Sequence, residues 1–157
     1  MKRKKNRRLL RANFPDLTSY GLRPERQLRS MLGGGLLTQD LDTMVLRPEG
    51  VTCATDREPT EEEMRSLLFA WRIVKHVRSN AIVLAKDTRT VGIGAGQMSR
   101  VDASCIAVWK AGERVRDTVL ASDAFFPMRD AVDAAADAGG TAVIQPGGSK
   151  GDEEVTA

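Results

Sequence analysis

Apolar and polar positions follow two different kinds of pattern along this chain. Up to about residue 58 the pattern is irregular, with an expected strand near Arg29, three glycines at 33–35 and a mixed segment at 36–40. The three glycines predict either a plain turn or a flexible backbone that approaches a ligand closely. From residue 59 onward, helical spacing and short apolar runs alternate. We therefore divide the chain into an irregular, basic segment with a Gly-rich connection at 1–58 and a folded domain at 59–157.

The folded domain opens with a strong helix signal. Thr60 and Glu63 have the spacing of a capping box, in which each side chain satisfies a backbone N–H at the helix start. Apolar residues then recur at helical spacing, which predicts a helix that ends near Val77 or Arg78. The next segments predict a strand at 81–85, a turn at 87–89 and a returning strand at 90–93.

The remaining pattern alternates between helix and strand. Ser99 predicts the cap of a helix that ends by Gly112, and residues 119–121 predict a buried strand. Pro127 suits the first turn of a helix that stops at 139–140, and residues 141–144 predict the next strand. This order predicts an α/β layered domain with a mixed sheet. Asp152 starts another helix signal close to the last residue, so we expect a C-terminally truncated domain.

Composition limits the classes of function. The 157 residues are 41% hydrophobic, which is enough for one core, and no apolar run reaches the roughly 20 residues that span a bilayer. The two cysteines indicate neither a disulfide framework nor a zinc site, so we expect a cytoplasmic protein with reduced thiols and no membrane contact. The first eleven residues are rich in Lys and Arg and lack acids, but aromatic residues make up only 4% of the chain. This favours a solvated basic terminus over nucleic-acid binding.

A glycine-rich segment at 91–100 is the strongest local signal for chemistry. Gly92, Gly94 and Gly96 follow a predicted strand and precede a predicted helix, where backbone N–H groups favour anions. Arg100 adds a planar fork of donors that suits phosphate or carboxylate. The glycine spacing matches neither the dinucleotide fingerprint nor a phosphate-binding Walker loop. An anion site and a tight strand-to-helix crossing are therefore both open.

Two further segments contain candidate residues. At 122–130, the paired rings Phe125 and Phe126 follow a strand end, where one ring can stack on a planar heterocycle or both can pack. His76 is the only histidine, so one chain has neither a Ser-His-Asp triad nor a His-ligated metal cluster. We interpret Lys75 and His76 as helix-surface residues. Asn80, next to a buried strand, is a better candidate because a buried amide needs partners.

Taken together, these segments resemble the C-terminal portion of the AICAR transformylase domain of the bifunctional purine-biosynthesis enzyme. The residues that carry the resemblance are 68–71, 75–87 (KHVRSNAIVLAKD), 91–101 (VGIGAGQMSRV), 120–130 (LASDAFFPMRD), 144–149 (IQPGGS) and 152–155. A looser similarity extends over residues 4–10 and 34–40. The resemblance implies a cytidine-deaminase-like fold and formyl transfer from 10-formyltetrahydrofolate to AICAR ribotide. It also implies a homodimer in the intact enzyme.

The resemblance also implies roles for individual residues. It assigns Asn80, Arg100 and Phe126 to the AICAR site, with Arg100 as the donor to the anionic or carboxamide group and Phe126 as the stacking surface. Residues near the folate would be Gln97, Ser99, Pro127 and Asp130. A structural potassium ion is implied near Val74, Ser79 and Asp123.

One departure from the family affects catalysis. The family's Lys-His pair, which handles the amine proton, lies in an upstream segment that this sequence lacks, and Lys75 and His76 are not that pair. We therefore expect no catalytic residue in this chain and no turnover without a partner that supplies the missing transformylase half. The alternatives are a non-catalytic module that binds folate or ribotide and, from the basic terminus, a nucleic-acid-binding protein.

Overall fold

The computed structural model describes residues 26–157, in two units that divide between Met44 and Val45. The basic terminus lies outside the described residues. In the first unit, β1 (Arg26–Ser30) and β2 (Leu36–Asp40) pair antiparallel, so the three glycines form the connection of a hairpin. Gly33 and Gly34 both adopt positive φ, at 99° and 93°, which explains why this turn requires glycine.

The second unit is an α/β domain around a four-stranded sheet in the order β4-β3-β5-β6. Its strands are β3 (Ile82–Lys86), β4 (Arg89–Gly94), β5 (Thr118–Ser122) and β6 (Gly140–Ile144). Strand β3 is antiparallel to β4 and β5, whereas β5 is parallel to β6 through the intervening α3 (Asp130–Asp137). The predicted mixed sheet is therefore confirmed.

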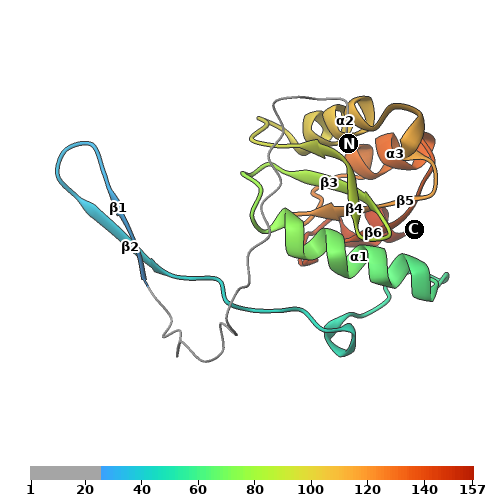
Figure 1. Ribbon diagram of the computed structural model, residues 1–157, viewed down its shortest axis with the longest axis horizontal. Coiled ribbons are helices and arrows are strands. Elements are labelled where there is room, and N and C mark those ends of the chain that lie inside the picture. Colours follow the sequence, from blue (N-terminus) through green and yellow to red (C-terminus); the bar gives the residue numbers. More distant parts are fainter. Residues whose placement is uncertain (1–25) are drawn as a thin grey trace, which may run out of the picture. The chain divides into compact units, whose positions relative to one another are not determined.

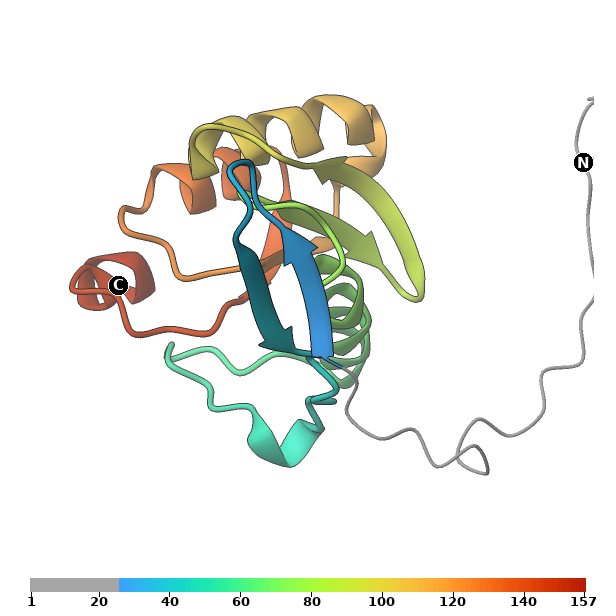
Figure 2. The same cartoon turned by 90° about the vertical axis from the view of Figure 1, so that its left-hand side faces the viewer.

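Helices cover both faces of the sheet (Figures 1 and 2). The helix α1 (Glu61–Val74) packs on one face, and α2 (Arg100–Ala111) with α3 packs on the other. Strand alternation divides the core accordingly: Ile82 and Leu84 of β3 face α2, whereas Val83 faces α1. The short elements are the 3-10 turns η2 (Pro48–Gly50) and η3 (Gly112–Val115) and the helix α4 (Asp152–Thr156).

Local sequence signals explain where the first two helices begin. The predicted capping box is present: Thr60 Oγ1 accepts from Glu63 N at 3.2 Å, and Glu63 Oε2 accepts from Thr60 N at 2.9 Å. Ser99 Oγ accepts from Asp102 N at 3.1 Å and caps α2, as predicted. All three hydrogen bonds satisfy N–H groups that a helix start leaves unpaired.

Two predicted helix boundaries are wrong. Helix α1 ends at Val74, because the next amides, of His76 and Val77, bond three residues back and tighten the chain into turns. Pro127 is not in the first turn of α3, which begins only at Asp130. Before α1, Leu46 and Val51 pack against the core on the α1 side, within the compact unit that begins at Val45.

The segment before α1 is tied to the sheet by Arg57. Its guanidinium forms two bonds to the Glu63 carboxylate, at 2.9 and 3.0 Å, and one to the Thr141 carbonyl at 2.6 Å. The hydrogen bond from Arg57 and the one from the Thr60 amide outweigh partial burial and lower the pKa of Glu63 to about 2. Among the described residues, no helix has the length and apolar character needed to cross a membrane.

Candidate functional site

The segments singled out in the sequence meet at one edge of the sheet. Ile82, at the start of β3, is paired with Gly94 at the end of β4 and with Ser122 at the end of β5. This pairing therefore brings Asn80, the start of α2 and Asp123 close together, although they are far apart in sequence. This is the edge at which open α/β sheets place ligands, beyond the carboxyl end of a strand such as β5.

Arg100 is the centre of this cluster. Its Nη1 donates to Ser122 Oγ and to Asp123 Oδ1, both at 2.7 Å, and its Nη2 donates to Asn80 Oδ1 at 3.1 Å. Only 9% of its side chain is exposed. A guanidinium this deeply buried needs an anionic partner and acceptors for its N–H groups. Asp123 provides the anion, and Ser122 and Asn80 provide further acceptor oxygens. We expected the Arg100 guanidinium to bind an external anion. In this structure it binds the Asp123 carboxylate instead.

Asp123 is the anionic partner. Its Oδ1 also accepts from the Ala81 backbone N–H at 2.8 Å, which links β5 to the start of β3. Burial by itself raises the pKa of the Asp123 carboxyl, but hydrogen bonds from Ser79 and Arg100 outweigh it, so the pKa lies below its ordinary value. The carboxylate therefore stays ionised and keeps the Arg100 pair charged.

Asn80 joins the cluster to the glycine-rich loop. Its Nδ2 donates to the carbonyls of Gln97 and Met98, at 3.1 and 3.3 Å, while its backbone exchanges hydrogen bonds with Gln97. Asn80 thus uses its amide as a donor to the loop and as an acceptor for Arg100. The prediction that this amide needs partners is confirmed.

The two phenylalanines face different surroundings. Phe126 is fully buried in the core on the α2 side, and the Arg100 guanidinium carbon lies 6.0 Å from the centroid of its ring. Phe125 is 42% exposed. The Phe126 backbone N–H donates to Gln145 Oε1 at 2.8 Å, so the end of β6 fixes this loop. Of the two rings, Phe125 is the one open to solvent.

The first two glycines of the 91–100 segment are explained by packing. A Cβ on Gly92 would collide with the Ala107 carbonyl oxygen, and one on Gly94 with the Ala103 carbonyl oxygen, because α2 crosses β4 at close range. Gly96 has a φ of 64° in the loop that follows. The structure therefore supports the tight strand-to-helix crossing for Gly92 and Gly94.

The four residues expected near folate lie on two segments that flank the cluster. Gln97 and Ser99 precede Arg100, where Gln97 Nε2 donates to the Ala95 carbonyl and Ser99 caps α2. Pro127 is exposed in the loop after Phe126, and Asp130 is exposed at the start of α3 with Oδ1 on the Ala131 N–H. Ser99 and Asp130 are at helix starts, where backbone donors favour anionic groups.

The residues expected around potassium fit such an ion in part. Ser79 and Asp123 are hydrogen-bonded to each other, and oxygen ligands of this kind suit a hard cation. The Val74 carbonyl accepts from the Val77 N–H in the turn after α1. Asp123 shares its charge with Arg100, so an ion there would rely mainly on neutral oxygens.

Two residues of the cluster were missed in the sequence. Ser122 bridges Arg100 to the Ala124 carbonyl through its hydroxyl, at 2.7 Å on each side, and Gln145 fixes Phe126. Both belong to segments that carry the family resemblance, which was the available signal. His76 is exposed just after α1, in agreement with its interpretation as a surface residue.

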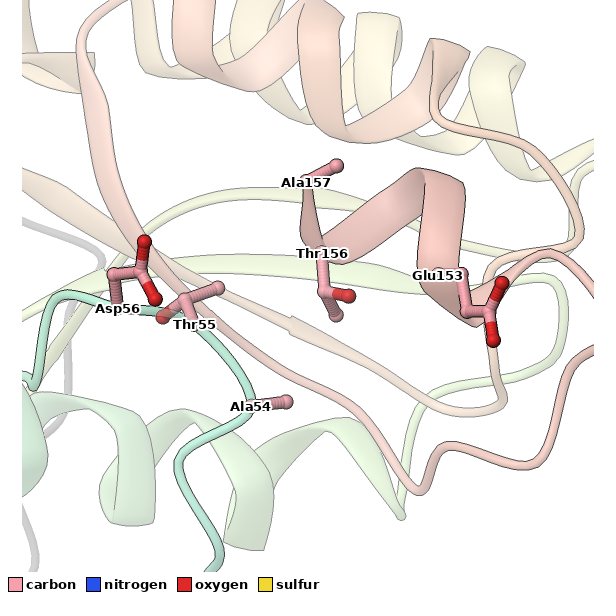
Figure 3. A pocket seen from close by; sticks show the side chains of 6 residues that line it. All are labelled: Ala54, Thr55, Asp56, Glu153, Thr156 and Ala157. Atoms are coloured by element: carbon pink, nitrogen blue, oxygen red, sulfur yellow. The ribbon is translucent and has the colours of Figure 1, made fainter.

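A separate open hollow of about 480 Å³ lies between the loop before α1 and helix α4 (Figure 3). It is lined by Ala54, Thr55, Asp56, Glu153, Thr156 and Ala157. These residues include two acids and no base, and none belongs to the Arg100 cluster. The hollow therefore does not coincide with the candidate site.

The fold and the cluster together define an α/β domain with a charged site at one sheet edge, and sequence comparisons give its family. The model of the AICARFT/IMPCHase bienzyme matches residues 1–110. The bifunctional purine biosynthesis protein PurH of Anoxybacillus flavithermus is 55% identical over 97% of this chain, and that of Magnetococcus marinus is 54% identical over 98%. The chain belongs to the AICARFT/IMPCHase bienzyme family. It spans 29–30% of the length of these relatives.

Proposed function

We propose that this chain is the C-terminal portion of an AICAR transformylase domain with the cytidine-deaminase-like fold. Its function would be in formyl transfer from 10-formyltetrahydrofolate to AICAR ribotide during purine biosynthesis. The observation that carries the proposal is the convergence on Arg100, whose Nη2 lies 3.1 Å from Asn80 Oδ1 and whose guanidinium lies 6.0 Å from the Phe126 ring. These are the three residues that the resemblance assigns to the substrate.

Each residue has a role in this proposal. Arg100 Nη2 donates to the phosphate or carboxamide of the ribotide, in place of or beside its bond to Asn80. Asn80 offers both a donor and an acceptor to a carboxamide. Phe126 provides the stacking surface, which a planar base reaches only if the side chains that bury the ring move. Gln97, Ser99, Pro127 and Asp130 contact the folate.

The reaction requires a proton transfer from the ribotide amine. The ribotide amine attacks the formyl carbon, a new C–N bond forms, the bond from that carbon to the folate nitrogen breaks, and the amine proton ends on that nitrogen. A positioned acid and base typically accelerate such a transfer about 10²–10⁴-fold. We assign this proton transfer to the missing transformylase half, because His76 is exposed after α1 and lies outside the Arg100 cluster.

An assay of tetrahydrofolate formation tests the proposal. With AICAR ribotide and 10-formyltetrahydrofolate, we expect no measurable turnover from this chain alone. We expect turnover when it is co-expressed with the A. flavithermus relative from which the matched region has been deleted. Turnover by the chain alone that His76→Ala abolishes would instead give the local pair the catalytic role. A stable complex of the two polypeptides without turnover would refute the formyltransferase proposal.

Binding without catalysis is the second candidate, and the same cluster favours it. Asn80, Arg100 and Phe126 lie together in this chain, whereas the proton-transferring pair belongs to an absent segment. The chain would then hold ribotide or folate as a module. Ribotide binding that persists while the co-expressed complex shows no turnover would distinguish this role.

Potassium would be structural, held by oxygen atoms of Val74, Ser79 and Asp123. The measurement is the melting temperature in potassium chloride against lithium chloride at equal ionic strength. We expect a higher midpoint in potassium, because an ion that binds only the folded state stabilises it. Equal midpoints would remove the ion from the proposal.

A further inference from the structure

Arg78, in the segment between α1 and β3, lies against the glycine-rich loop. Its backbone carbonyl accepts a hydrogen bond from Gly96 N at 2.7 Å. Its side chain passes over the same glycine, with Cδ and Cγ 3.6 and 3.9 Å from the position that a Cβ on Gly96 would take. Arg78 is nevertheless exposed. The alkyl part of the side chain therefore packs on the loop, and the guanidinium is held beside the loop with access to solvent.

The Arg78 guanidinium is not committed to a partner. It forms no hydrogen bond or ion pair with any residue that the structure describes. Arg100 differs, because it is only 9% exposed and is bound to the Asp123 carboxylate. The opposite charges of that buried pair largely cancel, so the pair attracts an incoming anion weakly. Arg78 therefore offers this edge of the loop an uncompensated positive charge and five N–H donors.

The neighbouring loop residues indicate which anion fits. Met98, two residues after Gly96, is 95% exposed and gives an adaptable apolar surface. Gln97 lies between them and is one of the residues that we assign to the folate. An apolar side chain close to a cation suits a ligand that joins a flat ring directly to a carboxylate. A folate has this form, since its benzoyl ring carries a glutamate, whereas the phosphate of the ribotide is attached to a polar sugar.

We propose that Arg78 binds the glutamate carboxylate of the folate cosubstrate at the rim of the candidate site. The proposal rests on the proposed function, which places the folate beside Gln97 and Ser99. The benzoyl ring then lies along Met98, and the glutamate extends toward solvent next to the Arg78 guanidinium. Arg78 is a binding residue in this arrangement and takes no part in the proton transfer.

Calorimetric titration of the full chain tests this assignment. One ligand is 10-formylfolic acid, a stable oxidised form of the cosubstrate, and the other is its dimethyl ester, in which both glutamate carboxylates are uncharged. The unmodified chain should bind the acid about threefold to fivefold more tightly than the ester, as expected for a partly exposed ion pair. The preference for the acid should shrink at high salt concentration, because salt screens exposed charges.

Two variants and a control separate the charge from the fold. Arg78→Gln should bind the acid and the ester equally, and Arg78→Lys should keep most of the preference for the acid. The matched control is Arg89→Gln, which changes an arginine that is also exposed, with 79% of its side chain accessible, at the end of β4 away from the loop. The control should bind both ligands like the unmodified chain. Circular dichroism shows whether each variant is folded.

The other outcomes overturn the proposal. They are equal affinities of the unmodified chain for the acid and the ester, and an Arg78→Gln variant that keeps the preference for the acid. A third is an Arg78→Gln variant that loses affinity for AICAR ribotide but not for its riboside, because the bound anion would then be the ribotide phosphate. Failure to bind either folate ligand would refute the folate site of the proposed function as well, whereas binding without a preference refutes the role of Arg78 alone.

Discussion

At the scale of single residues, the central feature is the buried pair of Arg100 and Asp123. The two side chains are 9% and 13% exposed and 2.7 Å apart, and the same carboxylate oxygen accepts the Ala81 N–H. The sequence could identify Arg100 and Asn80 as candidates from the glycine-rich loop and the strand start. It could not show that Arg100 faces inward, because Ser122 and Asp123 come from a strand that only the sheet topology brings near.

We expect Asp123→Asn to destabilise the fold by about 3–5 kcal/mol, because it leaves the Arg100 charge buried without an anion. The matched control is Asp133→Asn, which removes one partner of the exposed pair with Arg129, whose side chains are 53% and 45% exposed. That change should cost less than about 0.5 kcal/mol. Urea unfolding measures both. Similar losses for the two variants would show that the Arg100 pair behaves like a surface contact.

A second residue-scale prediction concerns acid. Because the Glu63 pKa is lowered from 4.5 to about 2 in the folded chain, its stabilisation is complete above about pH 4.5 and is lost as the pH falls toward 2. Glu63→Gln should therefore lower the free energy of unfolding at pH 7 by about 1–2 kcal/mol, and with it the melting temperature. The difference from wild type should shrink as the pH falls from about 4.5 toward 2. Glu62→Gln, an exposed acid in the same helical turn, is the control. A difference from wild type that does not depend on pH would contradict the assigned cause.

At the scale of elements, sequence signals predicted a helix start correctly where the cap acts within one turn of its own helix. They predicted it wrongly where contacts with distant segments decide the conformation. The capping box at Thr60 and the cap at Ser99 were predicted correctly because each acts within one turn of its own helix. The start of α3 was predicted wrongly at Pro127. Two contacts fix the loop before α3: Gln145 accepts a hydrogen bond from the Phe126 N–H, and Gly151 lies close to the Pro127 carbonyl. Both partners are distant in sequence, so a local sequence pattern does not predict these contacts.

The crossing of β4 and α2 gives a prediction at this scale. Gly94→Ala should destabilise the domain by about 2 kcal/mol or more, because the new methyl group collides with the Ala103 carbonyl and α2 must shift. Gly50→Ala is the matched control, since its added Cβ would meet only the end of the Leu46 side chain at 3.2 Å. Thermal unfolding compares the two. Equal stability would show that the glycine spacing does not serve close packing.

At the scale of the whole molecule, the α/β class and the mixed sheet followed from the order of helix and strand signals. The pairing of the first unit as a hairpin did not, because its strands lack alternating burial and their exposed leucines resemble core positions in sequence. The candidate residues belong to segments that resemble the family, and the structure brings three of them, Asn80, Arg100 and Phe126, close together. Leu46 and Val51 join the core as isolated apolar residues, which no periodic pattern in the sequence indicates.

The basic terminus supplies a prediction at this scale. Among the described residues, both hydrophobic cores draw on Leu46 and later positions, and we expect the second unit to fold without the first residues of the chain. Deleting residues 2–8 should leave the thermal midpoint within about 5 °C of the full chain, which corresponds to roughly 1 kcal/mol in a domain of this size. A larger drop would show that the terminus contributes to the fold.

The most direct test of the account is calorimetric titration of the purified chain with AICAR ribotide. We expect binding that Arg100→Ala weakens by about tenfold or more, since a charge-assisted buried contact contributes about 1.5–3 kcal/mol. Asn80→Ala, which keeps the Arg100–Asp123 pair, should also weaken it, and Arg89→Ala, at the far end of β4, should not. Circular dichroism confirms that each variant is folded. Equal affinities for all variants, or no binding by the unmodified chain, would contradict the assignment of the ribotide site to this cluster.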